Sequence, residues 1–238
     1  MNHGNRLLEA LPRTIYNGLK TSLIPISLRR GDVLHKPGAF IRTLHFPTNS
    51  LISITVTMPD GRIAEAGVVG NREVVGINAF MGGSETTETT YIVQMAGDAL
   101  KIASAPLLKA FDNNKSVRDV FLKFTQAHIA QISQNVACNR LHSLEQRYAR
   151  WLLEVRERVH RDDLVLTQEF ASEMLGVLRP AVSIAASTLE KNGVIERRRG
   201  VTFICDVAGL EKASCPCYRI IVGEYDRLLG QVISSRIH

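Results

Sequence analysis

Apolar residues recur at helical spacing close to the N-terminus. Within residues 5–22 they stand at Leu7, Leu8, Leu11, Ile15 and Leu19. Spacings of three and four residues place such side chains on one face of a helix. Pro12 falls inside this pattern and interrupts it, because proline has no backbone N–H to donate. We therefore expect a short amphipathic helical segment that is broken early.

The period changes after Pro25 from that of a helix to that of strands. Runs at 51–56 and 91–95 are rich in apolar and β-branched residues. Asp60-Gly61 lies between two runs and predicts a hairpin turn. Strands separated by such turn signals favour a sandwich or barrel over residues 27–103. The glycines that mark the turns are Gly31, Gly38, Gly61, Gly67, Gly70, Gly76, Gly82, Gly83 and Gly97.

The pattern becomes helical again after Pro106, and two apolar stripes run along the helix expected over 116–139. A helix with two stripes needs two partners: one stripe can cover the β-domain, and the other can pair with the same helix of a second subunit. A helix buried inside one chain is the alternative. The candidate dimer-interface residues are Leu122, Ile129, Ile132 and Val136 on the stripe with heptad spacing, and Val117, Phe121 and Phe124 on the other.

Three helical segments and a hairpin follow. We expect the helices at 143–159, 167–175 and 179–192. The hairpin strands are expected at 194–198 and 201–205, with the turn at Arg199-Gly200. This order of elements is typical of a winged helix-turn-helix.

Residues 166–190 suit that motif position by position. Thr167 can cap its helix, because its hydroxyl accepts a hydrogen bond from an unpaired backbone N–H. Gly176 suits the turn, where a left-handed backbone or a close approach is needed. Pro180 is tolerated in the first turn of the next helix, where N–H groups lack helical partners. The residues of that helix expected in the core are Val182, Ala185, Ala186 and Leu189.

The outward residues of this segment are candidates for contact with DNA, because a recognition helix enters the major groove by its N-terminal end. Arg179 can bind a guanine edge or a phosphate through both arms of its guanidinium. Thr167 and Gln168 suit a backbone phosphate at a helix N-terminus. Three wing arginines would add attraction to phosphates that is independent of sequence. The candidate DNA-binding residues are Thr167, Gln168, Arg179, Pro180, Ser183, Ser187, Arg197, Arg198 and Arg199.

The net charge permits an anionic partner without demanding one. The 238 residues include 29 Lys and Arg against 23 Asp and Glu, a formal net charge of +6. Residues 1–138 carry 14 basic and 10 acidic side chains, and residues 139–238 carry 15 and 13. Neither half is a polycation, so a binding face must arise from where the charges are placed.

The cysteine content and the apolar runs indicate a location. Four cysteines, clustered toward one end, are too few for a disulfide-stapled secreted domain. Residues 1–11 hold no apolar run of signal-peptide length, and no run approaches the roughly 18 apolar residues of a membrane span. We expect a cytoplasmic protein.

Several stretches resemble the Crp/Fnr family of bacterial transcription regulators. Residues 166–204 resemble the DNA-binding domain of that family, with the turn, second helix and basic hairpin in order. The β-roll sensor domain of the family is similar to four further stretches, residues 30–38, 45–47, 58–61 and 69–76. The resemblance extends over nearly the whole chain, from residue 6 to residue 225.

The resemblance implies an α+β fold. An N-terminal double-stranded β-helix, or β-roll, of the cyclic-nucleotide-binding type would be joined by a long dimerisation helix to a C-terminal winged helix-turn-helix. The implied boundaries are 1–115 for the sensor domain, 116–139 for the dimerisation helix and 140–238 for the DNA-binding domain. The implied function is sequence-specific regulation of transcription by a homodimer on a palindromic DNA site, with RNA polymerase as a further partner.

The stretch 76–91 departs from the cyclic-nucleotide-binding members of the family. Those members carry a glutamate and, further along, an arginine that neutralises the cyclic phosphate. Ile77 and Glu88 stand near those places here, and no Arg or Lys occurs between Arg72 and Lys101. A carboxylate repels a phosphate, so we do not expect cyclic AMP to bind. The candidate effector pocket consists of Gly76, Ile77, Glu88 and Thr89.

No cofactor is predicted. The iron–sulfur members of the family hold their cluster with several cysteines, mostly near the N-terminus, whereas the first cysteine here is Cys138. An iron–sulfur cluster is therefore not expected. His45 or His128 could serve as a haem ligand, although a single histidine is more often a structural residue.

The pair Cys215 and Cys217 is not explained by the resemblance. A Cys-x-Cys pair could form a redox couple or bind a soft metal, with Cys205 near it. The alternative is that these are small buried apolar residues. No histidine lies nearby in the sequence to complete a zinc site, so no metal is predicted.

A rival interpretation is a small-molecule-binding β-roll module, or an enzyme, with no role on DNA. Catalysis needs a nucleophile, a base and a way of holding the substrate. The sequence contains no Gly-x-Ser-x-Gly, P-loop or His-Glu-x-x-His motif. We therefore predict a DNA-binding regulator and not an enzyme.

Overall fold

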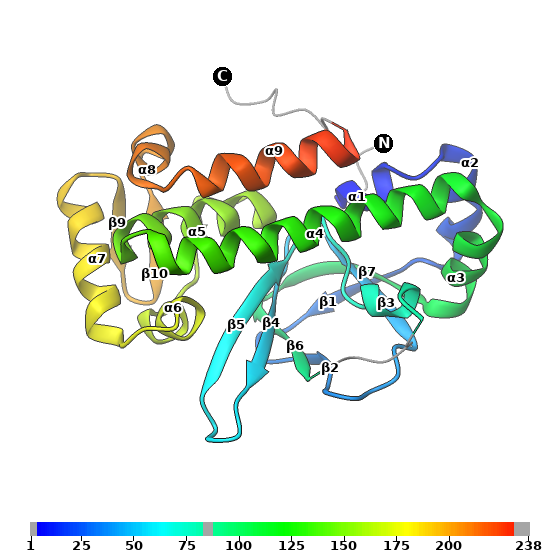
Figure 1. Cartoon of the computed structure of the whole chain (residues 1–238), viewed down its shortest axis with the longest axis horizontal. Helices are drawn as coiled ribbons and strands as arrows, with labels where there is room; N and C mark the ends of the chain where they lie inside the picture. The colour runs from blue at the N-terminus through cyan, green and yellow to red at the C-terminus, as the bar shows by residue number, and fades with distance from the viewer. Residues whose placement is uncertain (1–3, 83–87, 231–238) are drawn as a thin grey trace.

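A computed structural model describes residues 4–82 and 88–230 of the chain. Figure 1 shows strands β1 to β7 on one side of the long helix α4, with helices α5 to α8 and strands β9 and β10 gathered at one end of that helix. The α+β fold class expected from the sequence is confirmed, with antiparallel sheets first and a helix-turn-helix after the long helix.

The β-roll consists of two antiparallel sheets whose apolar faces pack together. The strands expected at 51–56 and 91–95 are confirmed as parts of β4 and β6. One sheet has the order β1-β7-β3, formed by β1 (Ile24–Leu28), β7 (Gly97–Ala103) and β3 (Thr43–Pro47). The other has the order β2-β6-β4-β5, formed by β2 (Val33–His35), β6 (Thr89–Met95), β4 (Leu51–Thr57) and β5 (Ile63–Val69), and a short 3-10 helix, η2 (Ile77–Phe80), follows β5.

The hairpin between β4 and β5 turns where the sequence predicts. Gly61 has a φ of +84°, in the left-handed region that favours glycine. The Met58 N–H donates to the Arg62 carbonyl at 2.8 Å, and the Gly61 N–H donates to the Met58 carbonyl at 2.9 Å. These two bonds close the turn and set the pairing of the two strands.

The N-terminal segment is helical and broken at Pro12, as expected. Helix α1 spans Arg6–Glu9, α2 spans Arg13–Leu19 and the 3-10 helix η1 spans Lys20–Ser22. Pro12 is the N-cap residue of α2. The apolar side chains of this segment pack in one core with α4 and the last of the described helices.

Helix α3 (Ser104–Asn113) leads into helix α4 (Lys115–Leu141), whose 27 residues extend over about 40 Å. The Asn114 side chain caps α4 by accepting from the backbone N–H groups of Ser116 and Val117. The helix covers the whole of the range 116–139 expected from the sequence.

The two apolar stripes of α4 have different environments. Leu122, Ile129, Ile132 and Val136 are 40–64% exposed, whereas Val117, Phe121 and Phe124 are at most 1% exposed. The assignment of Val117, Phe121 and Phe124 to a dimer interface is therefore wrong. Their side chains face the core of the chain itself, where the apolar surfaces of the N-terminal helices, α3 and the last helix cover them.

The C-terminal part forms the winged helix-turn-helix, and its helices begin and end within a residue or two of the expected positions. Its elements are α5 (Leu144–Val159), β8 (Asp163–Leu164), α6 (Gln168–Leu175), α7 (Arg179–Lys191), β9 (Ile195–Arg198) and β10 (Val201–Ile204). The strands pair in the order β8-β10-β9, so the wing gains a short third strand that the sequence did not indicate.

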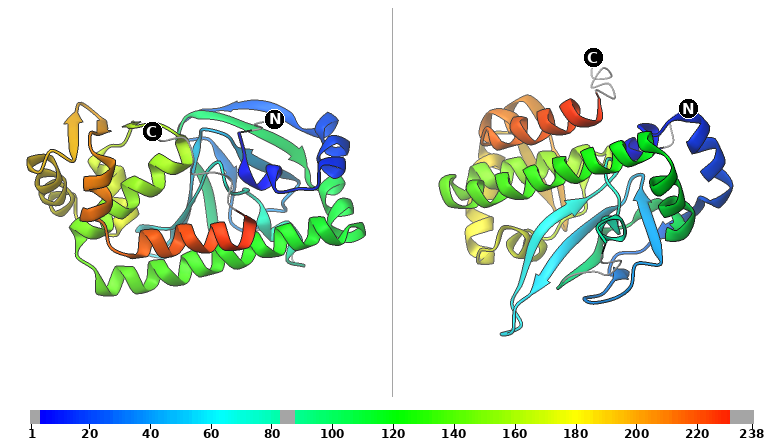
Figure 2. Two further views of the ribbon diagram at one scale, coloured as in Figure 1. Left: turned by 90° about the horizontal axis from the view of Figure 1, so that it is seen from above. Right: turned by 45° about the vertical axis from the view of Figure 1, so that its right-hand side comes forward.

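Two helices end the described chain, α8 (Val207–Ala213) and α9 (Cys217–Leu229). Helix α9 lies alongside α4 and runs in the opposite direction (Figure 2). Its buried residues Ile221 and Tyr225 join the core that holds Phe121 and Phe124. None of the described helices has both the length and the apolar character that crossing a membrane requires.

A buried cluster of charges connects the β-roll to the helices. Glu73 follows β5 and is fully buried, and its Oε1 accepts from Nη2 of Arg158 on α5 at 2.9 Å. Arg72 Nε donates to the same oxygen at 3.0 Å. The other carboxylate oxygen, Oε2, accepts from the Gly70 backbone N–H at 2.6 Å. The carboxylate is thus fully bonded where water is excluded.

The same cluster reaches α4 and α9. Gln131 on α4 accepts through Oε1 from Arg158 Nη2 at 3.3 Å and from the Tyr225 hydroxyl at 3.0 Å. The guanidinium of Arg72 lies over the Tyr225 ring, 4.3 Å from its centre. A charged network therefore holds the β-roll, both long helices and the C-terminal helix together.

Removing the Glu73 charge is expected to destabilise the fold. Burial raises the pKa of Glu73, but Arg158 and Arg72 lower it more, so the net pKa lies below its usual range. Glu73→Gln removes the charge that Arg158 and Arg72 share and leaves Glu154, whose Oε2 lies 3.5 Å from Arg158 Nη1, as the acidic partner of Arg158. Breaking a buried pair in this way is expected to cost about 3 kcal/mol in the free energy of unfolding at neutral pH. Urea unfolding, followed by the fluorescence of the single tryptophan, Trp151, measures this cost.

The same substitution gives a pH dependence of known sign. Because the folded pKa is lowered, the Glu73 contribution is present above the ordinary carboxyl pKa and is lost as the pH falls through the folded value. The stability gap between the wild type and Glu73→Gln should therefore narrow in acid. Glu173→Gln, which changes an exposed carboxylate on α6, is the control and should not alter the profile. A gap that is constant with pH would show that the charge of Glu73 contributes nothing.

Candidate nucleic-acid interface

Local sequence sets the α6–turn–α7 geometry. The Thr167 hydroxyl accepts from the Phe170 backbone N–H at 3.1 Å and so caps α6, as expected. Gly176 ends α6 with a φ of +63°, in the left-handed region. Helix α7 begins directly after Leu178, and Pro180 lies in its first turn, where its missing N–H has no consequence.

One face of α7 is fixed in the core of this part of the chain. The predicted core positions are confirmed: Val182, Ala185, Ala186 and Leu189 are at most 5% exposed. On α6, Ala171 and Leu175 are also buried. The opposite face of α7 is therefore turned outward along its whole length.

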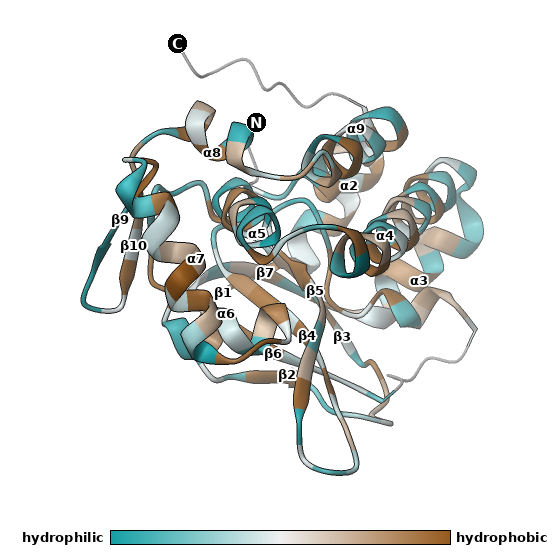
Figure 3. Cartoon of the chain, turned by 60° about the vertical axis from the view of Figure 1, so that its left-hand side comes forward, coloured by the Kyte–Doolittle hydropathy of each residue, from teal (hydrophilic) through white to brown (hydrophobic). Residues whose placement is uncertain are grey.

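A groove of about 660 Å³ lies between the N-terminal ends of the two helices and the wing. Figure 3 shows the β9–β10 hairpin beside α7, with β9 largely hydrophilic. The groove brings together most of the predicted DNA-binding residues from segments far apart in the sequence. It is lined by Leu166, Thr167, Gln168, Glu169, Arg179, Glu190, Arg197, Arg198, Arg199, Gly200, Val201 and Thr202.

Arg179 occupies the first position of α7 with an exposed side chain. Its Nε lies 4.0 Å from Oε2 of Glu169, and both side chains are at least 65% exposed. An exposed pair at this distance contributes little and is easily exchanged for another acceptor. Ser183, one turn further along α7, donates from its hydroxyl to Gln168 Oε1 at 2.6 Å. The start of α6 is thereby held against the outward face of α7.

Arg197 on the wing forms hydrogen bonds with side chains of α7. Its guanidinium donates to Glu190 Oε2 at 2.6 Å and to the Ser187 hydroxyl at 3.0 Å. The side-chain and backbone hydrogen bonds from Arg197 hold the pKa of Glu190 below its usual range. Arg197 and Ser187 therefore fasten the wing to α7, a role that the sequence did not indicate.

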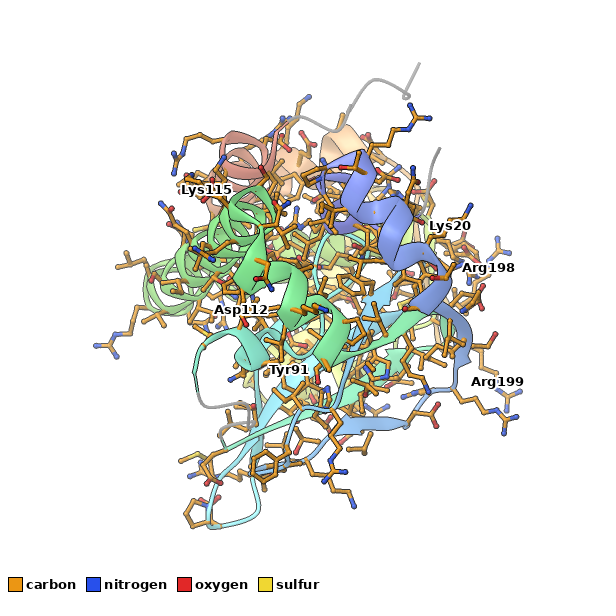
Figure 4. All side chains as sticks on the ribbon, turned by 90° about the vertical axis from the view of Figure 1, so that its right-hand side faces the viewer. Lys20, Tyr91, Asp112, Lys115, Arg198 and Arg199 are labelled. Atoms are coloured by element: carbon orange, nitrogen blue, oxygen red, sulfur yellow. The ribbon has the colours of Figure 1, made fainter. Side chains whose placement is uncertain are left out.

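The side chains of the other two wing arginines are more exposed to solvent. Arg198 pairs with Glu196 at 2.8 Å, and its guanidinium lies 5.1 Å from the centre of the Phe203 ring. Arg199 is exposed at the tip, and no acidic side chain of the described residues pairs with it. Both side chains extend away from the ribbon in Figure 4. Arg199 is the wing cation most accessible to an anion.

Two side chains of the outward surface, Glu169 and Leu178, were missed by the sequence reasoning. Glu169 lines the groove beside Arg179, and a carboxylate there can accept from the amino group of cytosine. Leu178, directly before α7, is 81% exposed, and Ile184 on α7 is 70% exposed. Exposed apolar side chains on a recognition helix suit the methyl group of thymine. An apolar residue in the turn directly before Arg179 was the available signal for Leu178.

Comparison with protein families gives a match over this part of the chain. Residues 146–213 match the model of the Crp-like helix-turn-helix domain. This chain carries a Crp-like helix-turn-helix domain. Over these residues the match confirms the resemblance to the DNA-binding domain of Crp/Fnr regulators, and with it the DNA-binding class of function that the resemblance implies. A comparison with curated protein sequences gives no match.

Solved structures share the fold over about four fifths of the chain. FixK2 from Bradyrhizobium japonicum has a TM-score of 0.69 at 14% identity, covering 81% of this chain and 98% of its own. The c-di-GMP responsive global regulator CLP of Xanthomonas campestris has a TM-score of 0.64 at 14% identity, covering 81% and 99%. A Crp/Fnr-family regulator from Thermus thermophilus has a TM-score of 0.64 at 18% identity, covering 80% and 98%. These similarities concern the architecture, a β-roll that precedes the Crp-like domain.

The candidate effector residues, which precede the Crp-like domain, lie in different environments. Gly76 and Ile77 are buried at the start of η2, and a Cβ at Gly76 would lie 2.9 Å from Ile41 Cγ2. Glu88 is exposed, and Thr89 is half-buried at the start of β6. The rest of the stretch, residues 83–87, lies outside the described residues. A pocket formed by these four residues remains a prediction.

The histidines of the β-roll are buried. His45 is 5% exposed and has no partner for Nδ1. Burial, together with the nearby positive charges of His35 and Lys101, lowers the pKa of His45 to about 4. His128 on α4 stacks on Phe124, and burial lowers its pKa as well. These are neutral, packed side chains at physiological pH.

The cysteines are arranged differently from the sequence expectation. Cys215 and Cys217 lie with Cys138 of α4, not with Cys205, which is exposed. A histidine is present as well: His142 Nδ1 lies 3.4 Å from Cys217 Sγ. The expectation that no histidine completes the set is therefore wrong. It failed because His142 is 75 residues away in the sequence and is brought back by the antiparallel packing of α9 on α4.

The capping contact of the Crp-like domain gives a direct test of its geometry. Thr167→Ala removes the acceptor for the Phe170 N–H, and we expect a loss of about 1 kcal/mol in the free energy of unfolding. Thr167→Ser keeps the oxygen and should retain most of the stability. Trp151 packs on Phe170 with ring centres 5.6 Å apart, so its fluorescence in urea follows this region. Equal losses in both variants would mean that the cap does not stabilise α6.

Proposed function

We propose that the chain is a homodimeric transcription regulator that recognises a palindromic DNA site with helix α7. The observation that carries the proposal is the position of the Arg179 side chain. Its exposed guanidinium stands at the N-terminal end of an outward-facing helix, on a groove shared with the wing. A helix that enters a major groove by this end presents its first outward residues to base edges.

The residues divide into two roles on this proposal. Arg179 reads a base edge, since its two arms match the acceptors of guanine, and Glu169, Leu178 and Ile184 supply further discrimination. The start of α6 and Arg199 bind phosphates, which sets the orientation and most of the salt-dependent affinity. Arg197 acts indirectly, because its bonds to Glu190 and Ser187 hold the wing in place.

The exposed stripe of α4 supports dimerisation. Leu122, Ile129 and Val136 repeat every seven residues and are 52–64% exposed, with Ile132 on the same stripe. An apolar row with heptad spacing is suited to pairing with the same row of a second copy. The opposite stripe is already covered by the core of its own chain. One face of the helix is thus left for a partner.

The proposed organisation is a β-roll sensor at 1–115, a pairing helix at 116–139 and the DNA reader at 140–238. We propose that the effector of the roll is a compound other than cyclic AMP, since no basic side chain lies between Arg72 and Lys101 to neutralise a cyclic phosphate. The cytoplasmic location and the contact with RNA polymerase follow from the same proposal.

DNA binding is tested with duplexes selected from a random pool and with the DNA upstream of the gene of this protein. We expect enriched palindromes with half-sites about one helical turn apart. Arg179→Ala should cost about 1–3 kcal/mol on the selected duplex and relax its sequence preference. Arg199→Ala should weaken binding to all duplexes alike and reduce the salt slope by about one unit per chain. Gel shifts at two or more salt concentrations measure both effects.

A matched control uses an arginine far from the groove. Arg227→Ala on α9 removes an exposed guanidinium paired with Glu224, and it should leave both affinity and preference unchanged. If Arg179→Ala keeps the sequence preference of the wild type, helix α7 is not the recognition helix. If no duplex is enriched, the proposal fails as a whole.

Dimerisation is tested by sedimentation. Ile129→Glu places a charge in the centre of the exposed stripe and should shift the wild-type dimer to monomer, because burying an unpaired charge is costly. Lys123→Glu, on another exposed side of α4, should leave the dimer intact. A wild-type chain that sediments as a monomer at all concentrations would exclude the proposed pairing.

A further inference from the structure

Four sulfur and nitrogen ligand atoms converge where α4 ends and α9 begins. Cys138 lies in the last turn of α4, and His142 is the residue that caps this helix. Cys215 lies between α8 and α9, and Cys217 is the first residue of α9. The three cysteines are at most 1% exposed, and they form a separate cluster in the interior.

The spacing of these atoms matches a tetrahedral site. All four ligand atoms lie within 4.8 Å of one another. Cys138 Sγ is 3.4 Å from Cys215 Sγ, and Cys217 Sγ is 3.4 Å from His142 Nδ1. A zinc ion with bonds of about 2.3 Å to sulfur and about 2.0–2.1 Å to nitrogen separates its ligand atoms by roughly 3.5–3.8 Å. Small side-chain movements are enough to bring one ion into contact with all four atoms.

The surroundings supply the support that thiolate ligands need. Gln134 on α4 donates from Nε2 to Cys217 Sγ at 3.1 Å. Arg147 and Arg150 on α5 lie within Coulombic range of Cys138 and Cys215. Three thiolates and a neutral imidazole around Zn²⁺ carry one net negative charge, and the positive charge of Arg147 contributes to offsetting it, while Arg150 is also paired with Glu154. A donor that hydrogen-bonds to a ligand atom, as Gln134 does to Cys217, orients the ligand and tunes its affinity for the metal.

We propose that Cys138, His142, Cys215 and Cys217 bind one Zn²⁺ ion per chain in a structural Cys₃His site. On binding, the three thiols lose their protons to solvent, and His142 coordinates as the neutral imidazole through Nδ1. Four protein ligands leave no position for water or substrate, which is characteristic of a structural and not of a catalytic zinc. The sulfur-rich donor set selects against the hard ions Mg²⁺ and Ca²⁺.

The position of the site gives it a mechanical role. The ion would tie the first residue of α9 to the last turn of α4. It would also fix His142, which stands at the junction between α4 and α5. This junction joins the long helix to the Crp-like domain. The inference does not depend on DNA binding, because metal content and DNA affinity are measured separately.

The test uses the full-length chain, purified under reducing conditions, stripped with a chelator and reloaded with zinc. We expect about one zinc per chain by elemental analysis. Titration with Co²⁺ should give the visible bands of tetrahedral cobalt and intense near-ultraviolet sulfur-to-cobalt charge transfer, displaced by one equivalent of zinc. A thiol-modifying mercurial should release the zinc, and a chromogenic chelator detects it.

Variants separate the site from general effects on the thiols. Cys217→Ser should lower zinc affinity at least 100-fold, and Gln134→Ala should lower it 10- to 100-fold. Cys205→Ser is the matched control, since it removes the exposed cysteine outside the cluster and should bind zinc like the wild type. The Trp151 fluorescence and circular dichroism of each variant show whether it is folded.

Three results would overturn the proposal, and the first two do not depend on whether a variant folds. The first is a reduced wild-type chain that holds well under one zinc and gives no charge-transfer band with cobalt. The second is a disulfide between Cys138 and Cys215 in freshly isolated protein kept from air, shown by alkylation and mass spectrometry. Equal zinc loss in folded Cys205→Ser and Cys217→Ser would also exclude this set of ligands.

Discussion

The buried ion pair between Glu73 and Arg158 is the constraint on which the relative placement of roll and helices depends. Two charges out of water are tolerated only when nearly all of their hydrogen-bonding capacity is used. Here the carboxylate accepts from Arg158, Arg72 and the Gly70 backbone. Glu73 comes from the loop after β5 and Arg158 from α5, so their direct contact at 2.9 Å fixes the position of one part relative to the other.

Gly70 shows how closely the two parts approach. A Cβ on this residue would lie 2.3 Å from Cβ of Arg158, so no other amino acid fits without a shift of α5. The N-terminal segment also contacts this region, since the Asn5 side-chain amide donates to the Glu73 backbone carbonyl at 2.9 Å. A glycine and an asparagine with no catalytic or DNA-binding role thereby become structurally specific residues.

The helix-turn-helix domain packs on the β-roll through a shared apolar core. Leu51 and Val68 of β4 and β5 pack in one cluster with Trp151 and Phe170 of the Crp-like domain. The Ser53 hydroxyl of β4 lies 3.5 Å from Met174 Sδ of α6. Helix α6 therefore uses one side to support α7 and another to contact the strands. Any change in the position of β4 or β5 therefore alters the surface of the β-roll that contacts the helix-turn-helix domain.

Local chemistry made the α6–turn–α7 unit predictable. A cap at Thr167, a left-handed glycine at 176 and an apolar face on α7 each depend on residues within one turn of helix. The hairpins at Gly61 and Gly200 were predictable for the same reason. The long helix was predictable too, but which of its stripes is covered depends on α9, whose packing on α4 joins residues about a hundred positions apart.

Two of the groups that sequence reasoning missed depend on such distant contacts. Arg72 and Glu73 look like an ordinary surface pair until α5 brings Arg158 to them. Cys138 and His142 look unrelated to Cys215 until α9 returns along α4. The wing arginines looked equivalent, and only the position of Glu190 on α7 distinguishes Arg197 from Arg199.

The exposed row of α4 has a consequence for the length of the DNA site. In a two-fold pair, each residue of the row faces its own copy, and the two readers are placed symmetrically. A slip of one heptad along the helix would displace one reader by about 10 Å relative to the other. This is close to a third of the 34–36 Å turn of DNA, enough to rotate one half-site out of reach. In the dimer that we propose, the side chains that hold the register of the two helices therefore also set the distance between the two half-sites of the DNA.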